Sequence, residues 1–211
     1  MIMKIYLIRH GRQASRLCNV DVDLSPEGCR QAVLVGERLA GQKIQIVYSS
    51  ALKRAVQTAR IANRCWNVDH KVEPELREID FGLMEGLSDE EIWERFGELK
   101  REQQKMDRDL PYPDGECAGD VIRRAMPVLE RIGRGEEERA AVVTHGGLIR
   151  SVVSHILGME PGTYRLLGKS LENCSITELR FDRETGRFAL ERFNDYSHLE
   201  QEPELLRAGW N

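Results

Sequence analysis

The stretch from Lys4 to Gly11 places the tightest constraint on how this chain folds. It is an apolar run with β-branched residues that ends abruptly in Arg9, His10 and Gly11. A short, continuous apolar run bounded by a turn residue predicts a buried strand of a parallel sheet. Because ligands of open α/β sheets bind beyond the carboxyl ends of such strands, Arg9 and His10 stand where a site is expected. Taken alone, the stretch is equally consistent with a strand end that carries polar residues by chance.

The rest of the chain alternates between predicted strands and predicted helices. Further strands are expected at residues 44–48, 68–72 and 140–144, with a hairpin at 174–181 and 187–193. Helices are expected at residues 26–40, 51–64, 88–107, 118–132 and 148–157. Ser25 is a suitable N-cap for the first helix, whereas Pro127 should bend or split the fourth. This order predicts an α/β fold: a three-layer α/β/α sandwich whose mainly parallel central sheet has an antiparallel edge strand.

The length and composition favour one globular domain. The 211 residues, 41% of them hydrophobic, contain no internal repeat and no low-complexity linker, so residues 1–211 are expected to form a single domain with a C-terminal tail at 195–211. No apolar run is long enough to span a bilayer, which predicts a cytoplasmic protein without a membrane partner. The net charge of −4 argues against a nucleic-acid partner. The sequence leaves open whether the protein is a monomer or a homodimer.

The cysteines do not indicate a metal or disulfide framework. There are five, an odd number, and no two of them form a Cys-x-x-Cys pair. They are therefore expected to be reduced thiols, several of them in the core. We expect no metal site and no cofactor.

Three of the predicted parallel strands lead into residues that bind anions. The first ends in Arg9 and His10, the second leads through two serines to Arg54, and the strand at 140–144 ends in His145. Since these ends lie at one edge of the sheet, two arginines and two histidines can converge there, with helix N-termini behind them. Arginines give bidentate contacts to phosphate oxygens, so such a pocket suits a dianion.

Four motifs, which follow one another along nearly the whole chain, resemble those of the histidine phosphatase superfamily, the phosphoglycerate-mutase-like proteins. They are Leu7-Ile8-Arg9-His10-Gly11, Ser50-x-Leu52-x-Arg54-Ala55-x-Gln57-Thr58-Ala59, Leu76-Arg77-Glu78-x-x-x-Gly82 and Val143-Thr144-His145-Gly146-Gly147. The Arg-His-Gly triplet alone is a weak signal, but the four motifs in order are highly specific.

The resemblance implies a role for each of five residues. His10 would be the nucleophile that forms a phosphohistidine intermediate, which water then hydrolyses. Arg9, Arg54 and His145 would hold the phosphoryl oxygens and neutralise charge in the transition state. Glu78 would protonate the leaving oxygen and then activate water. No metal would be required, because the charges of arginine and histidine take over that role.

Other residues near these motifs are open to more than one interpretation. Glu78 lies among several acids, so Asp80 or Glu85 are alternatives for the acid role. Gly146 and Arg16 are expected to contact the substrate, although Arg16 could equally point into solvent. Asn173 either lines the edge of the pocket or stabilises a turn.

The family contains both mutases and phosphatases, and this sequence is closer to the phosphatases. Mutases usually carry Glu directly after Arg-His-Gly and Asn six residues after the nucleophile, where this chain has Arg12 and Arg16. Residues 81–86 and 195–199 are similar to those of broad-specificity phosphatases and, for the former segment, of α-ribazole phosphatases. The expected function is metal-independent hydrolysis of small phosphorylated metabolites. The alternatives are a cofactor-dependent phosphoglycerate mutase and a regulatory phosphatase directed at phosphohistidine in a partner protein.

Overall fold

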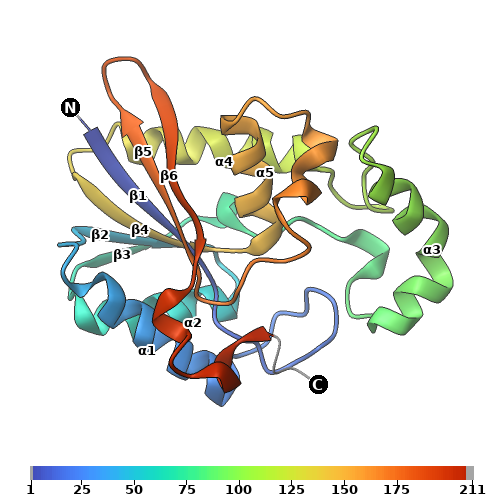
Figure 1. Ribbon diagram of the computed structural model, residues 1–211, viewed down its shortest axis with the longest axis horizontal. Helices are drawn as coiled ribbons and strands as arrows, with labels where there is room; N and C mark the ends of the chain where they lie inside the picture. The colour runs from blue at the N-terminus through green and yellow to red at the C-terminus, as the bar shows by residue number, and fades with distance from the viewer. Residues whose placement is uncertain (1, 208–211) are drawn as a thin grey trace.

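Six strands form one sheet at the centre of the molecule, in the order β3-β2-β4-β1-β5-β6 (Figure 1). The computed structural model describes residues 2–207, so Met1 and the last four residues of the predicted tail lie outside the described part. The strands are β1 (Ile2–Arg9), β2 (Ile46–Ser49), β3 (Asp69–Val72), β4 (Arg139–Thr144), β5 (Ile176–Asp182) and β6 (Arg187–Asp195). The first four are parallel, and β5 and β6 form an antiparallel pair beside β1. The predicted sheet is confirmed.

Helices cover both faces of this sheet, which gives the predicted three layers (Figure 1). On one face lie α1 (Pro26–Ala40) and α2 (Lys53–Ala62), and on the other lie α4 (Ala118–Gly133) and α5 (Gly146–Ile156). Alternate residues of β1 divide between the two layers: Leu7 packs with α4 and α5, whereas Ile8 packs with α1 and α2. Complete burial of a side chain of this size stabilises the fold by about 1.5–3 kcal/mol.

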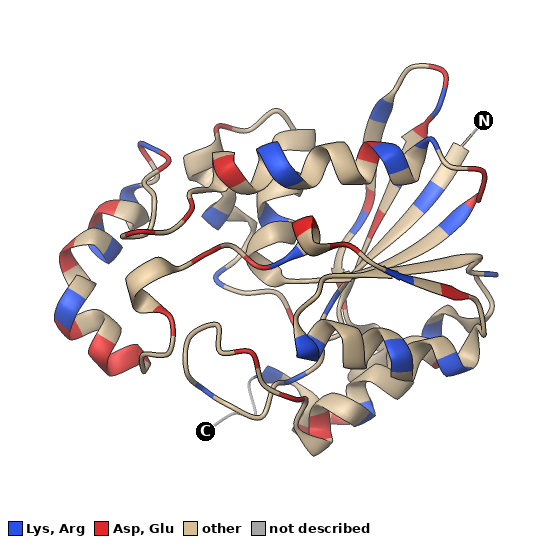
Figure 2. Ribbon diagram, turned by 180° about the vertical axis from the view of Figure 1, so that it is seen from behind, with Lys and Arg blue, Asp and Glu red and all other residues tan. Residues whose placement is uncertain are grey.

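The remaining helical segments lie outside the two layers. The helix α3 (Asp89–Lys105) stands beside the sandwich (Figure 1). The short 3₁₀ segments are Asn63–Cys65, Pro74–Leu76, Gly82–Met84, Pro161–Leu167, Ser197–Leu199 and Pro203–Leu205. Acidic and basic residues are interspersed along α3 and α4 (Figure 2), so neither helix is a surface of one sign.

Local signals in the sequence fix where α1 and α3 begin. The Ser25 hydroxyl accepts a hydrogen bond from the Gly28 N–H, and Ser88 and Glu91 form a complete capping box at the start of α3. Such caps stabilise a helix by about 1 kcal/mol each. The split considered for the fourth helix at Pro127 is wrong, because α4 continues through it. Its long buried face against the sheet compensates for the one backbone hydrogen bond that proline removes.

The segment predicted as a tail is docked on the body of the protein. Leu199 and Leu205 are fully buried, and Gln31 Nε2 of α1 donates to the Leu205 carbonyl at 2.7 Å. Arg30, also on α1, forms ion pairs with two glutamates of this segment. These contacts bring the chain back to the loop that follows β1 and place Arg207 beside the end of that strand.

The cysteines agree only in part with the expectation of reduced thiols, several of which lie in the core. All five thiols are free, and Cys174 is buried, but Cys29 and Cys65 are exposed, so the expectation of several cysteines in the core holds poorly. Cys29 lies on the exposed side of α1, and Cys65 ends the 3₁₀ segment that follows α2, so neither thiol faces the core.

None of the helices within residues 2–207 has the length and apolar character needed to cross a membrane.

Candidate active site

The register of the sheet brings the predicted strand ends together. Arg9 lies opposite Thr144 in the parallel pairing of β1 with β4, and Ser49 of β2 lies one residue earlier along the other side of β4. The His10 N–H continues this ladder by donating to the Thr144 carbonyl at 2.9 Å. The residues that follow the three strands, including His10 and His145, therefore emerge at one edge of the sheet.

His10 is held with one ring nitrogen available for attack. Its side chain is buried, and Nδ1 lies 2.7 Å from the Gly11 carbonyl oxygen. Because a carbonyl only accepts, Nδ1 carries the proton and Nε2 keeps its lone pair. Burial and the positive charges of Arg54 and Arg9 hold the pKa of His10 well below its ordinary value of 6.5. The ring is therefore neutral at physiological pH, which is the form a nucleophile needs.

Arg54 anchors the loop after β1 against His10. It is 1% exposed, its Nη1 donates to the Val20 carbonyl at 3.0 Å, and its Nη2 donates to Asn19 Oδ1 at 2.5 Å. The third donor, Nε, points to His10 Nε2 at 3.3 Å. Within the described residues no carboxylate forms an ion pair with this buried cation. A buried charge without a counter-ion indicates a site for an anionic ligand.

Arg9 is the second cation of the site, and it is partly buried. Its Nη1 donates to the Leu171 carbonyl and to Ser170 Oγ, the latter at 3.3 Å, whereas Nε has no partner among residues 2–207. Burial and the nearby charge of Arg207 lower the pKa of Arg9 to about 9, so it stays charged at neutral pH. A methyl group at Gly146 would lie 3.4 Å from Arg9 Nε, which shows how closely α5 approaches this side chain.

His145 lies directly behind His10, with ring centres 5.0 Å apart. It is completely buried, and burial, Arg54 and the neighbouring histidine lower its pKa below 6.5. Its Nε2 lies 2.7 Å from the Ser50 hydroxyl, which itself accepts the Leu52 N–H at 3.4 Å. The hydroxyl hydrogen is thus free to point at Nε2, which leaves the proton of the neutral ring on Nδ1. That N–H has no partner among the described residues and can donate to a ligand.

Glu78 is bound at the start of α5. Its carboxylate accepts the N–H groups of Gly147 and Leu148, each at 3.1 Å, and that of Ile79 at 2.9 Å. A Cβ atom at Gly147 would lie 2.5 Å from Glu78 Oε1, so a residue without a side chain is needed there. The helix N-terminus favours a negative charge at this point.

A cavity of about 500 Å³ contains these groups. Arg9, His10, Arg54 and Glu78 line it, and the buried ring of His145 lies behind them. The alternative acids do not line this cavity. The carboxylate of Asp80 accepts the Gly82 N–H at 2.7 Å, and that of Glu85 accepts from Asn19 at 2.6 Å. Of the three acids, Glu78 alone lines the cavity that contains His10.

The structure also locates the two residues whose positions were open. Arg16 is exposed and contributes to the cavity wall. Asn173 is 1% exposed, lines the same cavity, and its Nδ2 donates to the His10 carbonyl at 2.8 Å. Asn173 thus holds the backbone of His10 and lies at the pocket as well.

Several wall residues were not found by sequence reasoning. Asn19 holds Arg54, Asp89 opens α3 beside the cavity, and Arg207 reaches the wall from the docked C-terminal segment. In the sequence, Asp89 resembles any acidic residue in the first turn of a helix. No local pattern around Arg207 distinguishes it from other residues of the C-terminal segment. These positions depend on how loops and the C-terminal segment fold over the sheet edge.

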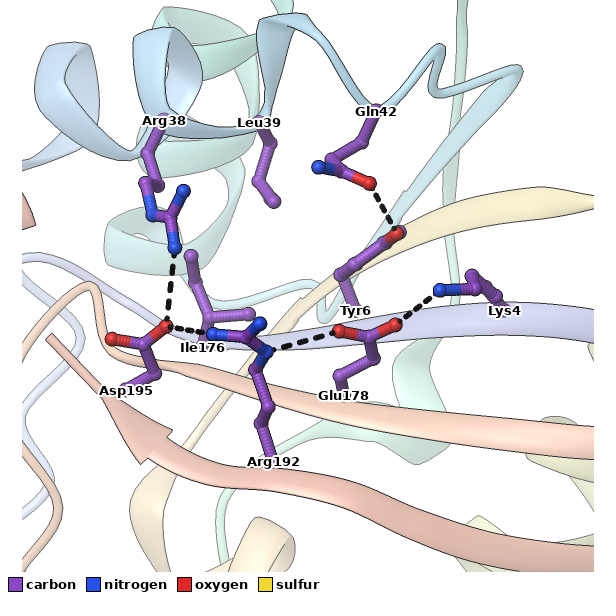
Figure 3. A pocket seen from close by; sticks show the side chains of 9 residues that line it. All are labelled: Lys4, Tyr6, Arg38, Leu39, Gln42, Ile176, Glu178, Arg192 and Asp195. Carbon is purple, nitrogen blue, oxygen red and sulfur yellow. Dashed lines mark hydrogen bonds and ion pairs between the residues drawn. The ribbon is translucent and has the colours of Figure 1, made fainter. Parts of the chain in front are cut away.

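A smaller cavity of about 150 Å³ lies between α1 and the β1–β5–β6 edge of the sheet (Figure 3). Its charges pair with one another: Glu178 contacts Lys4 at 2.7 Å and Arg192 at 3.6 Å. Asp195 contacts Arg192 at 3.4 Å and Arg38 at 3.5 Å. This network satisfies its own cations, in contrast to the cavity at His10.

Within residues 2–207 no group of three histidine, cysteine, aspartate or glutamate side chains is arranged to hold a metal ion. The polar groups at His10 are instead donors: two guanidinium groups, an imidazole N–H and the start of a helix. Such a set is suited to bind the oxygens of a phosphoryl group and to stabilise negative charge that develops on them.

Known proteins share both the sequence and the fold. The phosphoglycerate mutase-like protein 4 of Arabidopsis thaliana is 34% identical, over 98% of this chain and 91% of that protein. The metal-independent phosphoserine phosphatase of Arabidopsis thaliana is 32% identical, over 94% of this chain and 84% of its own length. The solved structure of a mycobacterial glucosyl-3-phosphoglycerate phosphatase, 26% identical, superposes with a TM-score of 0.81 over 92% of this chain and 99% of that one.

The sequence profile of one family spans most of the molecule. Residues 5–196 match the histidine phosphatase superfamily (branch 1). This range contains all four motifs and the strands, helices and loops that carry Arg9, His10, Arg54, Glu78 and His145. The chain therefore belongs to the histidine phosphatase superfamily.

Proposed function

We propose that this protein hydrolyses phosphate monoesters of small metabolites through a phosphohistidine intermediate and without a metal ion. One observation carries the proposal: the unprotonated Nε2 of His10 lies 3.3 Å from the buried Arg54 guanidinium, Arg9 lines the same cavity, and neither guanidinium forms an ion pair with a carboxylate among the described residues. A dianionic phosphoryl group would supply the missing counter-charge and place phosphorus next to the nucleophile.

In the first half of the reaction, the phosphoryl oxygens bind Arg9, Arg54 and the Nδ1–H of His145. The lone pair of His10 Nε2 attacks phosphorus while the bond to the leaving oxygen breaks. Glu78, as the general acid, gives a proton to that oxygen, and the alcohol departs. Proton transfer of this kind contributes about 10²–10⁴-fold to the rate.

In the second half, water replaces the alcohol. Glu78, now a carboxylate, takes a proton from the water as its oxygen attacks phosphorus. The bond between phosphorus and His10 Nε2 breaks, which returns the lone pair to nitrogen and releases inorganic phosphate. The arginines neutralise the transferring group in both steps, a role that metal ions fill in other phosphoryl-transfer enzymes. The name of the Arabidopsis relative, a metal-independent phosphatase, supports this part of the proposal.

The test uses p-nitrophenyl phosphate, which hardly needs an acid for its leaving group. Purified protein is expected to release phosphate in the presence of EDTA, and His10→Ala is expected to lose at least about 10³-fold in kcat. The matched control is His155→Ala, which removes an exposed histidine on α5. Activity that disappears with EDTA, or that survives in His10→Ala, would contradict the proposal.

A mutase activity is the second candidate, because the 34% identical relative is named phosphoglycerate mutase-like. A mutase returns the phosphoryl group to the bound alcohol instead of transferring it to water. Incubation with 3-phosphoglycerate, with and without 2,3-bisphosphoglycerate, separates the two. We expect release of inorganic phosphate in both samples, whereas formation of 2-phosphoglycerate without phosphate release would favour the mutase.

We also propose that the protein acts in the cytoplasm. All five of its cysteines are free, and two of the thiols are exposed, which fits a reducing compartment. Fractionation of cells that produce the protein at its native level tests this location.

A further inference from the structure

A second, larger cavity adjoins the one that contains His10. It has a volume of about 640 Å³ and lies between α3 and the 3₁₀ segment Pro161–Leu167 (Figure 1 shows both elements). Cys18, Phe81 and Asp89 line both cavities, so the two are neighbours. A cavity of this volume accommodates a ligand of drug size, well above a three-carbon metabolite. We call it the α3 cavity.

The α3 cavity contains positive charge that the protein does not neutralise. Lys100, Arg150, Arg165 and Lys169 line it, against the single carboxylate of Asp89. Among the described residues none of these four cations forms an ion pair with a carboxylate. The cavity of Figure 3 is different, because its three cations share two carboxylates at 2.7–3.6 Å. With a net charge of −4 for the whole chain, this concentration of cations is local.

Aromatic rings hold three of these cations in place. The Arg165 guanidinium lies 4.5 Å from the ring centre of Tyr164 and donates to the Tyr112 hydroxyl at 3.2 Å. Arg150 lies 5.3 Å from the Tyr164 ring, and Lys100 lies 5.8 Å from the Tyr112 ring. Cations fixed over aromatic faces are already positioned to meet an anion, which reduces the entropy that binding costs.

Apolar side chains complete the wall. Met84 and Ile92 are buried there, while Trp93, near the start of α3, is 47% exposed. An exposed tryptophan beside a cavity commonly marks a contact surface for a ligand, because its ring loses little entropy on binding. The α3 cavity therefore combines an apolar surface with fixed positive charge. A short polar alcohol has neither the apolar surface nor the negative charge to bind both.

We propose that the α3 cavity binds the alcohol part of the substrate, and that this alcohol is elongated, with an apolar body and a second anionic group remote from the transferred phosphoryl group. This inference rests on the proposed function, because the phosphoryl group must occupy the cavity at His10. The apolar body lies along Phe81 and Trp93, and the remote anion lies at Arg165 and Lys100. The remote group is a carboxylate or a phosphate, since both are bound by the same donors.

The experiment compares alkyl phosphates with ω-carboxyalkyl phosphates of matched chain length, from four to ten carbons. We expect kcat/KM for the acidic series to exceed that of the neutral series by about tenfold once the chain is long enough to reach the cations. A third series with a terminal phosphate separates carboxylate from phosphate recognition. Equal kcat/KM for acidic and neutral probes at every length would overturn the proposal.

Two substitutions assign the effect to the cavity. Lys100→Gln and Arg165→Gln are expected to lower kcat/KM for the long acidic probe by about tenfold each and to leave the neutral probe within twofold. Arg165→Lys, which keeps the charge, is expected to recover part of the loss if the fold is intact. Lys105→Gln is the matched control, because this lysine lies on the same helix, is exposed and pairs with Glu102. Equal losses on both probes would contradict a role in binding the anion.

Binding measurements distinguish failure of this inference from failure of the proposed function. Calorimetry with His10→Ala, which retains both cavities, measures the affinity for the acidic and neutral probes without turnover. A preference for the acidic probe that Lys100→Gln removes supports the α3 cavity even if wild-type protein hydrolyses nothing. Hydrolysis of p-nitrophenyl phosphate without any such preference would leave the proposed function in place and overturn this inference.

Discussion

His145 Nε2 lies 2.7 Å from the hydroxyl of Ser50, a residue that follows the neighbouring strand β2. This contact determines which nitrogen of the buried ring carries the proton. The hydroxyl accepts the Leu52 N–H and still has its own hydrogen to donate to His145 Nε2, and in that arrangement the Nδ1–H is left for a phosphoryl oxygen. The histidine can thus donate to the substrate while neutral, which fits a pKa lowered by burial and by Arg54.

Ser50→Ala is therefore expected to weaken catalysis without disturbing the fold. Loss of the hydroxyl frees His145 to adopt the wrong tautomer, and the cost of one neutral hydrogen bond corresponds to about a tenfold decrease in kcat. Ser49→Ala is the matched control, because that buried hydroxyl contacts His70, outside the cavity, at 2.8 Å. Steady-state kinetics with p-nitrophenyl phosphate measure both. The same loss in the two variants would show that a buried hydroxyl matters here only for packing.

The leaving group decides how much the protein depends on Glu78. Glu78→Gln keeps the shape of the side chain but removes the proton that an alkoxide needs, so hydrolysis of an alkyl phosphate is expected to fall by about 10²–10⁴-fold. Hydrolysis of p-nitrophenyl phosphate should fall far less. Glu85→Gln serves as control, since that carboxylate does not line the cavity at His10. Equal losses on the two substrates would count against Glu78 as the acid.

The parts of the site that follow from the sequence are those fixed by strands. Arg9, His10 and His145 stand at the ends of buried apolar runs. The register of a parallel sheet therefore brings them together whatever conformation the loops adopt. The helix starts were predictable for a similar reason, because a cap such as Ser25 acts within one turn. The outcome at Pro127 was not, because tertiary packing of α4 outweighed a local rule.

The walls of the cavities could not be predicted from the sequence. Arg207 reaches the site only because Leu199 and Leu205 bury themselves against α1, and hydrophobic residues so close to a chain end give no sign of their partner. The cations of the α3 cavity come from α3, α5, the Pro161–Leu167 segment and the loop that follows it. Their proximity depends on contacts between residues far apart in the chain.

Acid is expected to destabilise the protein through its buried histidines. Burial lowers the pKa of His198 to about 4, below the value of 6.5 in the unfolded chain. Between these values the unfolded state binds more protons, so stability is present above pH 6.5 and is lost as pH falls. His198 should account for up to about 2 kcal/mol between pH 7 and pH 5. His10 and His145 act in the same direction.

Urea unfolding at pH 7 and pH 5 measures this effect. In His198→Gln, the unfolding free energy should fall less on acidification than in wild type, and the difference should equal the contribution of His198. The exposed His155 provides the control, because His155→Gln should leave the difference between the two pH values unchanged. An identical pH dependence in wild type and His198→Gln would show that this residue is not buried as a neutral ring.

Gly147→Ala tests whether the position of Glu78 depends on the close approach of α5. The added methyl group would lie 2.5 Å from Glu78 Oε1 and 2.8 Å from Ile79 Cγ2, so the carboxylate has to move away from the helix start. A displacement of about 1 Å at a catalytic group costs on the order of 10²-fold, and the loss should appear in kcat for an alkyl phosphate. Gly41→Ala is the matched control, because nothing lies within 4 Å of a methyl group there and its φ of −72° suits alanine. If Gly147→Ala hydrolyses alkyl phosphates as fast as wild type, then either the acid tolerates the shift or another group donates the proton, and Glu78→Gln measured beside it decides which.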